Sequence, residues 1–425
     1  MPGANPNHPE RRGVIAASTV GSKAREKQMN LNGHTRARQL QLAVSLVVAA
    51  ALSAGVSATA FASAGPKAAK APAVRPAPRM LAAGQVGTRS QVPWRKVGSG
   101  WALAQYTQGT VAAPKPVKLY LIDPSGGKYL LYAWRASQNP WELIGWSGDK
   151  TRALFGQNTT GSQTLRQLAL ATGRLMQPFR LPAKVAAIGY SSPDGKSILA
   201  TDDGLARYNL RGKFQARLIK GDQHDVALSA PNGSSYVVSS GTGVDLVSNR
   251  GGIIRSLPVP GTDAKLGGCT PARWWTPSTA LVTCTPKSDA VRLWLVPVSG
   301  SAPRPLQRHL KKPDLGYLDA WRLRSGLYLL AGCGPCHVAF LAYIAKLAAN
   351  GAVRPLEVPG NVNSNFVMAT SGTRMLVWEE SDCCGQDSPV VWFNPATRAV
   401  QTVLSARQDE QGVIFVVPYN REQNG

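Results

Sequence analysis

A short turn made of Gly, Asp, Asn, Ser and Pro recurs along this chain at intervals of about 46 residues, with one shorter interval near the middle. An apolar run of strand length follows each turn, and further short runs of strand character come after it. A repeat of that length, built only of short strands, is typical of a β-propeller, whose four-stranded blades bury their faces against one another. The seven turns are Ser99-Gly100, Gly148-Asp149, Asp194-Gly195, Asn232-Gly233, Pro277-Ser278, Ser325-Gly326 and Ser371-Gly372.

The first repeat lacks an innermost strand, and the chain's last apolar run lacks partners of its own. This run, residues 412–417, reads GVIFVV. If it supplies the missing strand, the ring closes and no sheet edge is left exposed to aggregation. The sequence therefore predicts an all-β, seven-bladed β-propeller over residues 98–420, with a C-terminal strand that closes the first blade. An irregular pair of β-sandwiches is the alternative.

The clearest copy of the repeat is Ser192-Pro193-Asp194-Gly195-Lys196, set within residues 185–219. This copy resembles the TolB-like propeller family, and degenerate copies follow at residues 229–238 and 274–283. The resemblance implies a propeller fold and often a binding role outside the cytoplasm. It implies no reaction, because propellers host enzymes and plain binding modules alike.

The N-terminal residues 1–64 have the character of a secretion signal. Residues 40–64 are uncharged and rich in Ala, Val and Leu, and they end in Ala62-Ser63-Ala64, a small-x-small cleavage site. The basic segment before them is long, so Met29 is a better start than Met1. The alternative is an uncleaved membrane anchor. Either arrangement leaves the propeller outside the cytoplasm, secreted or associated with the cell surface.

The chain is strongly basic, with a formal net charge of +25. Residues 65–97 form a basic linker rich in Ala and Pro, without a single acidic residue. A secreted basic protein is attracted to polyanions such as anionic lipid, acidic glycans or anionic cell-surface polymers. We expect no nucleic-acid partner, because no recognition motif is present. We expect membrane contact only through the signal segment, if it stays uncleaved.

Six cysteines in an exported chain predict three disulfides. The strand order of the repeats places all six on one face of three consecutive blades. We expect one bridge, Cys269–Cys284, inside the fifth blade. The other four could pair locally or across the blades, and they are Cys333, Cys336, Cys383 and Cys384.

Three other interpretations of these cysteines compete with disulfides. The run Cys333-Gly-Pro-Cys336-His337 matches the c-type haem attachment motif, but a hairpin turn leaves little room for haem. The same CGPC resembles the thioredoxin redox motif, which needs a helix that a hairpin lacks. A zinc site made by Cys333, Cys336, Cys383 and Cys384 is the third, although adjacent cysteines chelate one tetrahedral metal poorly. We therefore expect neither a cofactor nor a metal.

Polar residues in loops and on inner strands are expected to meet where the central channel of the predicted ring opens on one face, which is the common ligand position in propellers. The same Asp and Asn side chains also cap turns and strand ends in proteins that bind nothing there. The candidates for this binding face are His224, Asp225, Arg273, Tyr317, Asp319, Asn363 and Asn365.

Our first hypothesis is a non-catalytic module that binds a protein, a glycan or an anionic polymer at the cell surface. The alternative is a secreted lyase or glycosidase acting on acidic polysaccharide, with Asp225, Asp319 and His224 as acid/base candidates. No nucleophile-elbow, zinc-protease or phosphate-loop motif is present in the sequence. A third hypothesis is a redox, quinoprotein-like propeller, suggested by the adjacent Cys383 and Cys384.

Intact mass spectrometry of the exported protein tests these expectations together. We expect an N-terminus at Gly65, a mass lower by six hydrogens than that of the reduced chain, and no added group. Reduction should restore the six hydrogens. Free thiols, or a retained haem or metal mass, would contradict the three-disulfide prediction.

Overall fold

The computed structural model describes most of the chain from Met80 onward, and every described residue belongs to one compact unit. No helix among these residues is long and apolar enough to cross a bilayer. The predicted signal segment lies outside the described residues. The described ranges are 80–110, 113–135, 141–159, 161–191, 195–221, 226–230, 232–262, 268–285, 291–306, 316–333, 341–360, 364–380, 389–405 and 412–419.

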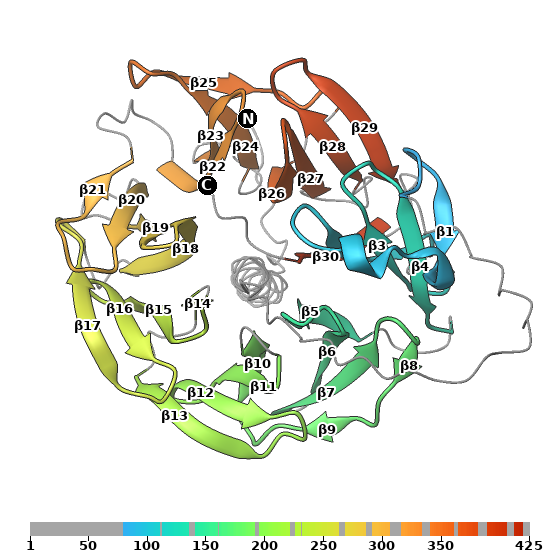
Figure 1. Ribbon diagram of the computed structural model, residues 1–425, viewed down its shortest axis with the longest axis horizontal. Coiled ribbons are helices and arrows are strands. Elements are labelled where there is room, and N and C mark those ends of the chain that lie inside the picture. The colour runs from blue at the N-terminus through green and yellow to red at the C-terminus, as the bar shows by residue number, and fades with distance from the viewer. Residues whose placement is uncertain are drawn as a thin grey trace, which may run out of the picture. The chain divides into compact units, whose positions relative to one another are not determined.

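The described residues form antiparallel sheets arranged like blades around a central axis (Figure 1). The helical elements in this part of the chain are two 3-10 turns, η1 (Arg89–Gln91) and η2 (Trp94–Lys96). In each sheet except an eight-stranded one, the strands follow one another from the axis outward. The prediction of an all-β propeller is therefore confirmed.

The first sheets of the ring hold the N-terminal half of the described chain. One contains β30 (Gly412–Pro418), β2 (Ala102–Thr107), β3 (Lys118–Ile122), β4 (Lys128–Ala133) and β1 (Val86–Thr88). The next contains β5 (Glu142–Trp146), β6 (Arg152–Thr159), β7 (Ser162–Ala169), β8 (Arg174–Leu175) and β9 (Phe179–Arg180). The third contains β10 (Ala186–Ser191), β11 (Ser197–Thr201), β12 (Gly204–Asn209) and β13 (Phe214–Lys220).

The remaining sheets complete the ring. An eight-stranded sheet contains β14 (Ala227–Ser229), β15 (Ser235–Ser240), β16 (Gly243–Ser248), β17 (Ile253–Pro258), β18 (Cys269–Thr276), β19 (Thr279–Cys284), β20 (Arg292–Pro297) and β21 (Arg304–Pro305). Two four-stranded sheets follow: β22 (Gly316–Leu323), β23 (Gly326–Cys333), β24 (Leu341–Leu347) and β25 (Val353–Leu356), then β26 (Ser364–Ser371), β27 (Arg374–Glu380), β28 (Val390–Asn394) and β29 (Ala399–Leu404).

The eight-stranded sheet consists of two meanders, β14–β17 and β18–β21. One residue pair, Ser240 with Cys269, joins β15 to β18. Counting the two meanders separately matches the seven repeats of the sequence. The number of blades stays a prediction, because the pairing of Ser240 with Cys269 joins the two meanders into one sheet.

The C-terminal strand β30 closes the first sheet as predicted. It pairs antiparallel with β2, from Ala102 opposite Pro418 to Thr107 opposite Gly412. The next residue, Tyr419, donates its hydroxyl to the carbonyl of Gly148 at 2.7 Å, so the same end of the chain also holds the second sheet.

The segment before β2 also packs on the propeller, although the sequence analysis assigned it to the linker. Strand β1 adds to the outer edge of β4 in parallel, with Val86 opposite Lys128. Val92 and Val97, on either side of η2, are buried in the core of the first two sheets. The described part of the predicted linker is therefore anchored.

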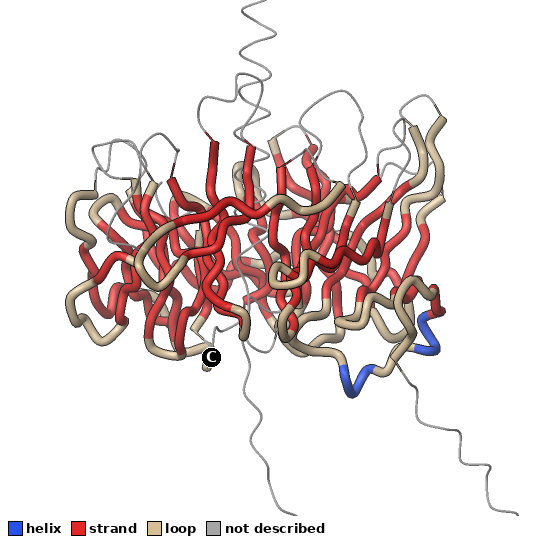
Figure 2. Tube along the Cα trace, turned by 90° about the horizontal axis from the view of Figure 1, so that it is seen from above, coloured by secondary structure: helices blue, strands red, loops and turns tan. Residues whose placement is uncertain are grey.

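The strand directions define two faces of the ring. We call the end at which the innermost strands begin the upper face, and the opposite end, which carries η1 and η2, the lower face (Figure 2). The turns of the sequence repeat lie on the lower face. Asx hydrogen bonds hold these turns, for example from the amide of Ser234 to Asn232 Oδ1 at 3.0 Å.

Neighbouring meanders are held together by buried aromatic residues with a polar end. Trp274 donates its indole N–H to the carbonyl of Ser229 at 2.6 Å, and Trp392 donates to Asp123 at 3.2 Å. Buried Trp and Tyr combine a large apolar area with one directional bond. They fix the contact between meanders as well as filling it.

Candidate functional site

The structure describes four of the seven predicted binding-face residues. Arg273 lies on β18, Tyr317 and Asp319 lie on β22, and Asn365 lies on β26. These are the innermost strands of three consecutive meanders. The other three, His224, Asp225 and Asn363, lie outside the described residues.

Arg273 and Asp319 form a two-pronged ion pair between adjacent inner strands. Arg273 Nε donates to Asp319 Oδ1 at 2.8 Å, and Arg273 Nη2 donates to Asp319 Oδ2 at 2.6 Å. The two residues are only 3% and 5% exposed. The guanidinium carbon also lies 4.5 Å from the ring centre of Trp321. Such a planar fork is the strongest geometry that a guanidinium and a carboxylate can make.

Both carboxylate oxygens of Asp319 are thus engaged, and Oδ1 also accepts the amide of Ala320 at 2.8 Å. The geometry gives this pair a structural task, which is to join two inner strands beside the axis. The predicted roles of Arg273 in binding and of Asp319 in acid/base chemistry stay predictions.

Tyr317 and Asn365 are buried as well, at 3% and 6% exposure. The backbone amide of Tyr317 donates to the carbonyl of Val291 at 3.0 Å, which ties β22 to the preceding meander. Asn365 stands opposite Glu379 in the β26–β27 pairing. Both predicted residues therefore belong to the packed inner wall of the ring near its upper face.

The predicted disulfide between Cys269 and Cys284 is confirmed. Cys269 begins β18 and Cys284 ends β19, so the bridge lies at the upper end of this hairpin. Cross-linking a segment of this length stabilises a fold by about 3 kcal/mol in the chain-entropy account. The bridge fixes the end of an inner strand at the predicted binding face.

The other four cysteines are not tested by the structure. Cys336, Cys383 and Cys384 lie outside the described residues, and nothing is described of the Cys333 side chain. His337, the last residue of the predicted haem motif, also lies outside them. Among the described residues, no group of three His, Cys, Asp or Glu side chains could hold a metal.

Glu379 is a buried carboxyl that the sequence analysis did not select. It is 5% exposed at the upper end of β27, beside Asn365. Burial raises its pKa from 4.5 to about 7. The signal in the sequence is a pair of glutamates, Glu379 and Glu380, directly after the apolar run MLVW. The run was interpreted as the second strand of its repeat, and nothing in the sequence indicated that the Glu379 side chain is buried.

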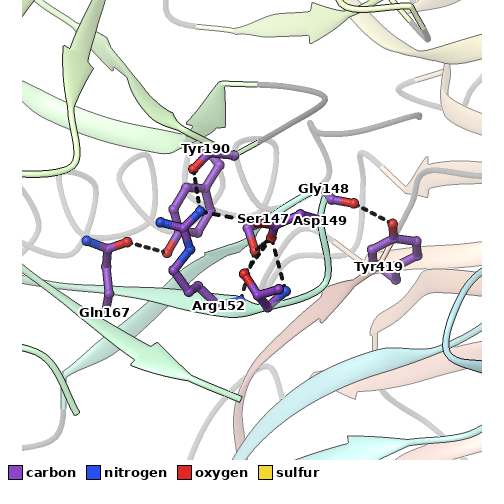
Figure 3. Close-up of polar contacts among 9 residues, drawn as sticks. Ser147, Gly148, Asp149, Arg152, Gln167, Tyr190 and Tyr419 are labelled. Atoms are coloured by element: carbon purple, nitrogen blue, oxygen red, sulfur yellow. Dashed lines mark hydrogen bonds and ion pairs between the residues drawn. The ribbon is translucent and has the colours of Figure 1, made fainter. Parts of the chain in front are cut away.

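A second polar network lies at the lower face, where the second and third sheets meet (Figure 3). Asp149 Oδ1 accepts from Ser147 Oγ at 2.6 Å and from Thr151 Oγ1 at 2.7 Å. Arg152 contacts Asp149 Oδ2 at 3.3 Å and donates to the carbonyl of Gly195 in the next sheet at 3.0 Å.

The charge state of this network is set by its hydrogen bonds. Burial works against ionisation of Asp149, but the bonds from Ser147 and Thr151 and the charge of Arg152 outweigh it, so its pKa is lowered. Tyr190, whose hydroxyl donates to Gln167 Oε1 at 3.1 Å, is fully buried, which raises its pKa. The turn between β5 and β6 is therefore a joint between sheets.

A shallow groove of about 580 Å³ lies on the outer side of the first two sheets. It runs beside the outer edge of β4, where Arg89 Nη1 donates to the carbonyl of Leu131 at 2.9 Å. The groove is distant in the fold from the predicted binding face. Its lining residues are Thr88, Arg89, Ser90, Leu130, Leu131, Tyr132, Ala133, Ala171 and Gly173.

Comparison with known proteins yields structural likeness only. No family model matches the chain, and no curated protein matches it. TolB from Acinetobacter baumannii is 12% identical, with 71% of this chain and 63% of that chain covered and a TM-score of 0.38. Hydrazine synthase from Kuenenia stuttgartiensis is 13% identical, with coverages of 66% and 86% and a TM-score of 0.44.

The periplasmic gluconolactonase of Pseudomonas aeruginosa is 17% identical, with 75% of this chain and 99% of that chain covered and a TM-score of 0.44. These scores are too low to carry an argument about activity. The assignment of this chain to the β-propellers rests on its strand topology.

Removing one member of the Arg273–Asp319 pair should destabilise the protein strongly. Arg273→Ala leaves a buried carboxylate without its partner, which costs about 3–5 kcal/mol. The double variant Arg273→Met/Asp319→Leu buries no charge, so it should recover most of that loss. Chemical denaturation of the three proteins measures the difference. A double variant no more stable than Arg273→Ala would contradict this account.

Glu379 should make the protein less stable as the pH rises. The unfolded chain releases this proton near pH 4.5, whereas the folded protein holds it until about pH 7. The stabilisation is therefore complete below pH 4.5 and is lost as the pH passes 7. Glu379→Gln should raise the stability at pH 8 by on the order of 2 kcal/mol and flatten the slope. Glu357→Gln, at an exposed carboxyl, is the control and should change neither.

Proposed function

We propose that this chain is an exported, TolB-like propeller that binds a macromolecular ligand with its upper face and does not transform it. The ligand is a protein, a glycan or an anionic polymer of the cell surface. Export is supported by the predicted signal segment and by the Cys269–Cys284 disulfide, because such bridges persist in oxidising compartments.

The observation that carries the proposal is the way the described inner wall is built. Arg273 and Asp319 neutralise each other beside Trp321, and the disulfide fixes the strand end above them. A wall held this rigidly presents the same described surface before and after a ligand arrives. Preorganisation of that kind favours affinity, because little conformational freedom is lost on binding.

The same observation weighs against the enzyme hypothesis. A general acid or base must exchange a proton with its substrate, and it works best when its pKa lies near the operating pH. Asp319 is instead closed off by Arg273 on both oxygens. An enzyme built on Asp319 would have to break this buried pair in every cycle.

Binding to isolated envelope material of the producing organism tests the proposal. The material is separated into protein, polysaccharide and anionic-polymer fractions, and the affinity of the purified protein for each is measured. His224→Ala/Asp225→Ala/Asn363→Ala should weaken binding to one fraction at least tenfold. Arg324→Gln/Asn350→Ala, on the lower face, is the control and should bind as the unaltered protein does.

Two results would overturn the proposal. One is equal binding by the upper-face variant and the unaltered protein. The other is release of shortened products from the polysaccharide fraction by the unaltered protein, which would establish the lyase or glycosidase instead.

A further inference from the structure

The exposed large hydrophobic residues of the described chain are few, and most of them lie on the outer strands of two consecutive meanders. Phe214 on β13 is 49% exposed, and Ile253 and Ile254 on β17 are 53% and 56% exposed. Figure 1 shows β13 and β17 one after the other along the outer rim of the ring. All three residues lie at the ends of these strands that begin on the lower face.

Basic residues lie next to these three residues in the sequence of the same two strands. Arg211 and Lys213 lie in the turn before β13, Arg250 lies in the turn before β17, and Arg255 lies on β17 itself. All four are exposed. Within the described residues, no hydrogen bond or ion pair engages any of their side-chain nitrogens. We call these four residues, together with Phe214, Ile253 and Ile254, the basic rim.

The acidic side chains nearest in sequence do not neutralise the positive charge of the basic rim. Asp202 and Asp203 lie in the turn between β11 and β12, at the upper face. Asp202 is engaged by Arg217 at 3.1 Å, a residue that we therefore leave out of the rim. Asp245, on β16, is buried.

The turn before β17 is fixed against the preceding sheet. The amide of Gly252 donates to the carbonyl of Leu218 on β13 at 2.9 Å, and Arg207 Nη1 donates to the carbonyl of Asn249 at 3.0 Å. Gly251 has a φ of 97°, and a Cβ there would lie 2.7 Å from the carbonyl oxygen of Arg217. Glycine permits this close approach. The start of β17 is therefore held in place beside the second half of β13.

The other outer strands show that this combination is local. Strands β21 and β25 carry exposed arginines, Arg304 and Arg354. Neither strand carries an exposed large hydrophobic residue. The remaining exposed hydrophobics of the described chain, Met80 and Val86, lie in the segment that leads into the first sheet.

That segment joins the propeller at the lower face. The amide of Gly84 donates to the carbonyl of Gly126, in the turn between β3 and β4. The apolar segment 40–64 of the sequence precedes Met80 by about fifteen residues. The described segment thus meets the ring on the lower face, where β13 and β17 also begin.

We propose that the basic rim docks onto an anionic lipid bilayer. The four cations attract anionic headgroups, and the three apolar side chains enter the boundary between headgroups and acyl chains. A soluble anionic polymer would use the charges but would give Phe214, Ile253 and Ile254 nothing to enter. Contact with the membrane then does not require the signal segment, and it leaves the upper face free for its own ligand.

Co-sedimentation of the full-length chain with lipid vesicles tests this docking. One set of vesicles is pure phosphatidylcholine, and the other contains 30% phosphatidylglycerol. Residues 40–64 are common to all variants, so their own contribution to binding cancels in the comparison. Circular dichroism and the melting temperature confirm that each variant is folded.

The charge variant Arg211→Gln/Lys213→Gln/Arg250→Gln/Arg255→Gln should bind anionic vesicles about tenfold less or weaker still. The matched control removes four exposed arginines elsewhere, as Arg174→Gln/Arg304→Gln/Arg324→Gln/Arg354→Gln, and should lose less than threefold. The apolar variant Phe214→Ser/Ile253→Ser/Ile254→Ser keeps the charge and should also lose about tenfold.

Each other outcome overturns the docking proposal. Equal loss in the charge variant and its control would show attraction by net charge alone. Unchanged vesicle binding by the apolar variant, with charge-dependent binding to soluble polyphosphate or heparin, would identify an anionic polymer as the partner. Neither result bears on the upper face, whose ligand is tested separately.

Discussion

The pairing of β2 with β30 is the interaction on which the rest of the structure depends. It brings together the two ends of the described propeller, and the entropy lost in joining such distant segments is recovered only when the whole ring packs. Further bonds secure the same junction: Lys128 Nζ donates to the carbonyl of Val403 at 2.5 Å, and Trp392 donates to Asp123 at 3.2 Å. Closure also removes the edges that β2 and β30 would expose if they were unpaired.

The innermost strands of a closed ring converge, so polar side chains on neighbouring strands are buried close to one another. Arg273 and Asp319 are buried in this way, and their opposite charges neutralise each other. The cost of dehydrating two charges makes such a pair a weak source of stability. The pair contributes specificity instead, because its planar two-pronged geometry restricts how β18 and β22 are placed relative to each other. The disulfide adds a covalent restraint at the end of the same strand.

The sequence predicted the features that depend on local pattern. Turn residues and strand lengths indicated the propeller, and the missing strand of the first repeat indicated closure by residues 412–417. The order of the strands also predicted Cys269–Cys284, because it placed both residues on one face of the fifth blade; the structure has them opposite each other on β18 and β19. These inferences need only the order of the strands.

Contacts between meanders were not predictable in this way. Arg273 and Asp319 were both selected as candidate ligands, but nothing in the sequence indicated that their side chains face each other across two sheets. Glu379 was missed for a related reason, since its burial is set by the neighbouring sheet and not by its own strand. Side-chain partners across blade interfaces depend on the rotation between the blades, which strand patterns do not encode.

Positive charge on an outer strand has two physical explanations, protection of a sheet edge and attraction to an anionic surface, and the basic rim allows them to be compared. Exposed Lys and Arg on an edge strand discourage pairing with another chain, and this suffices for β21 and β25. It does not suffice for β17, where two adjacent exposed isoleucines add to the tendency to aggregate that the charges oppose. Apolar and cationic side chains together on one edge are compatible with solubility when the apolar ones have a lipid surface to enter. The composition of β17 is therefore better explained by the surface that it meets than by the fold that it completes.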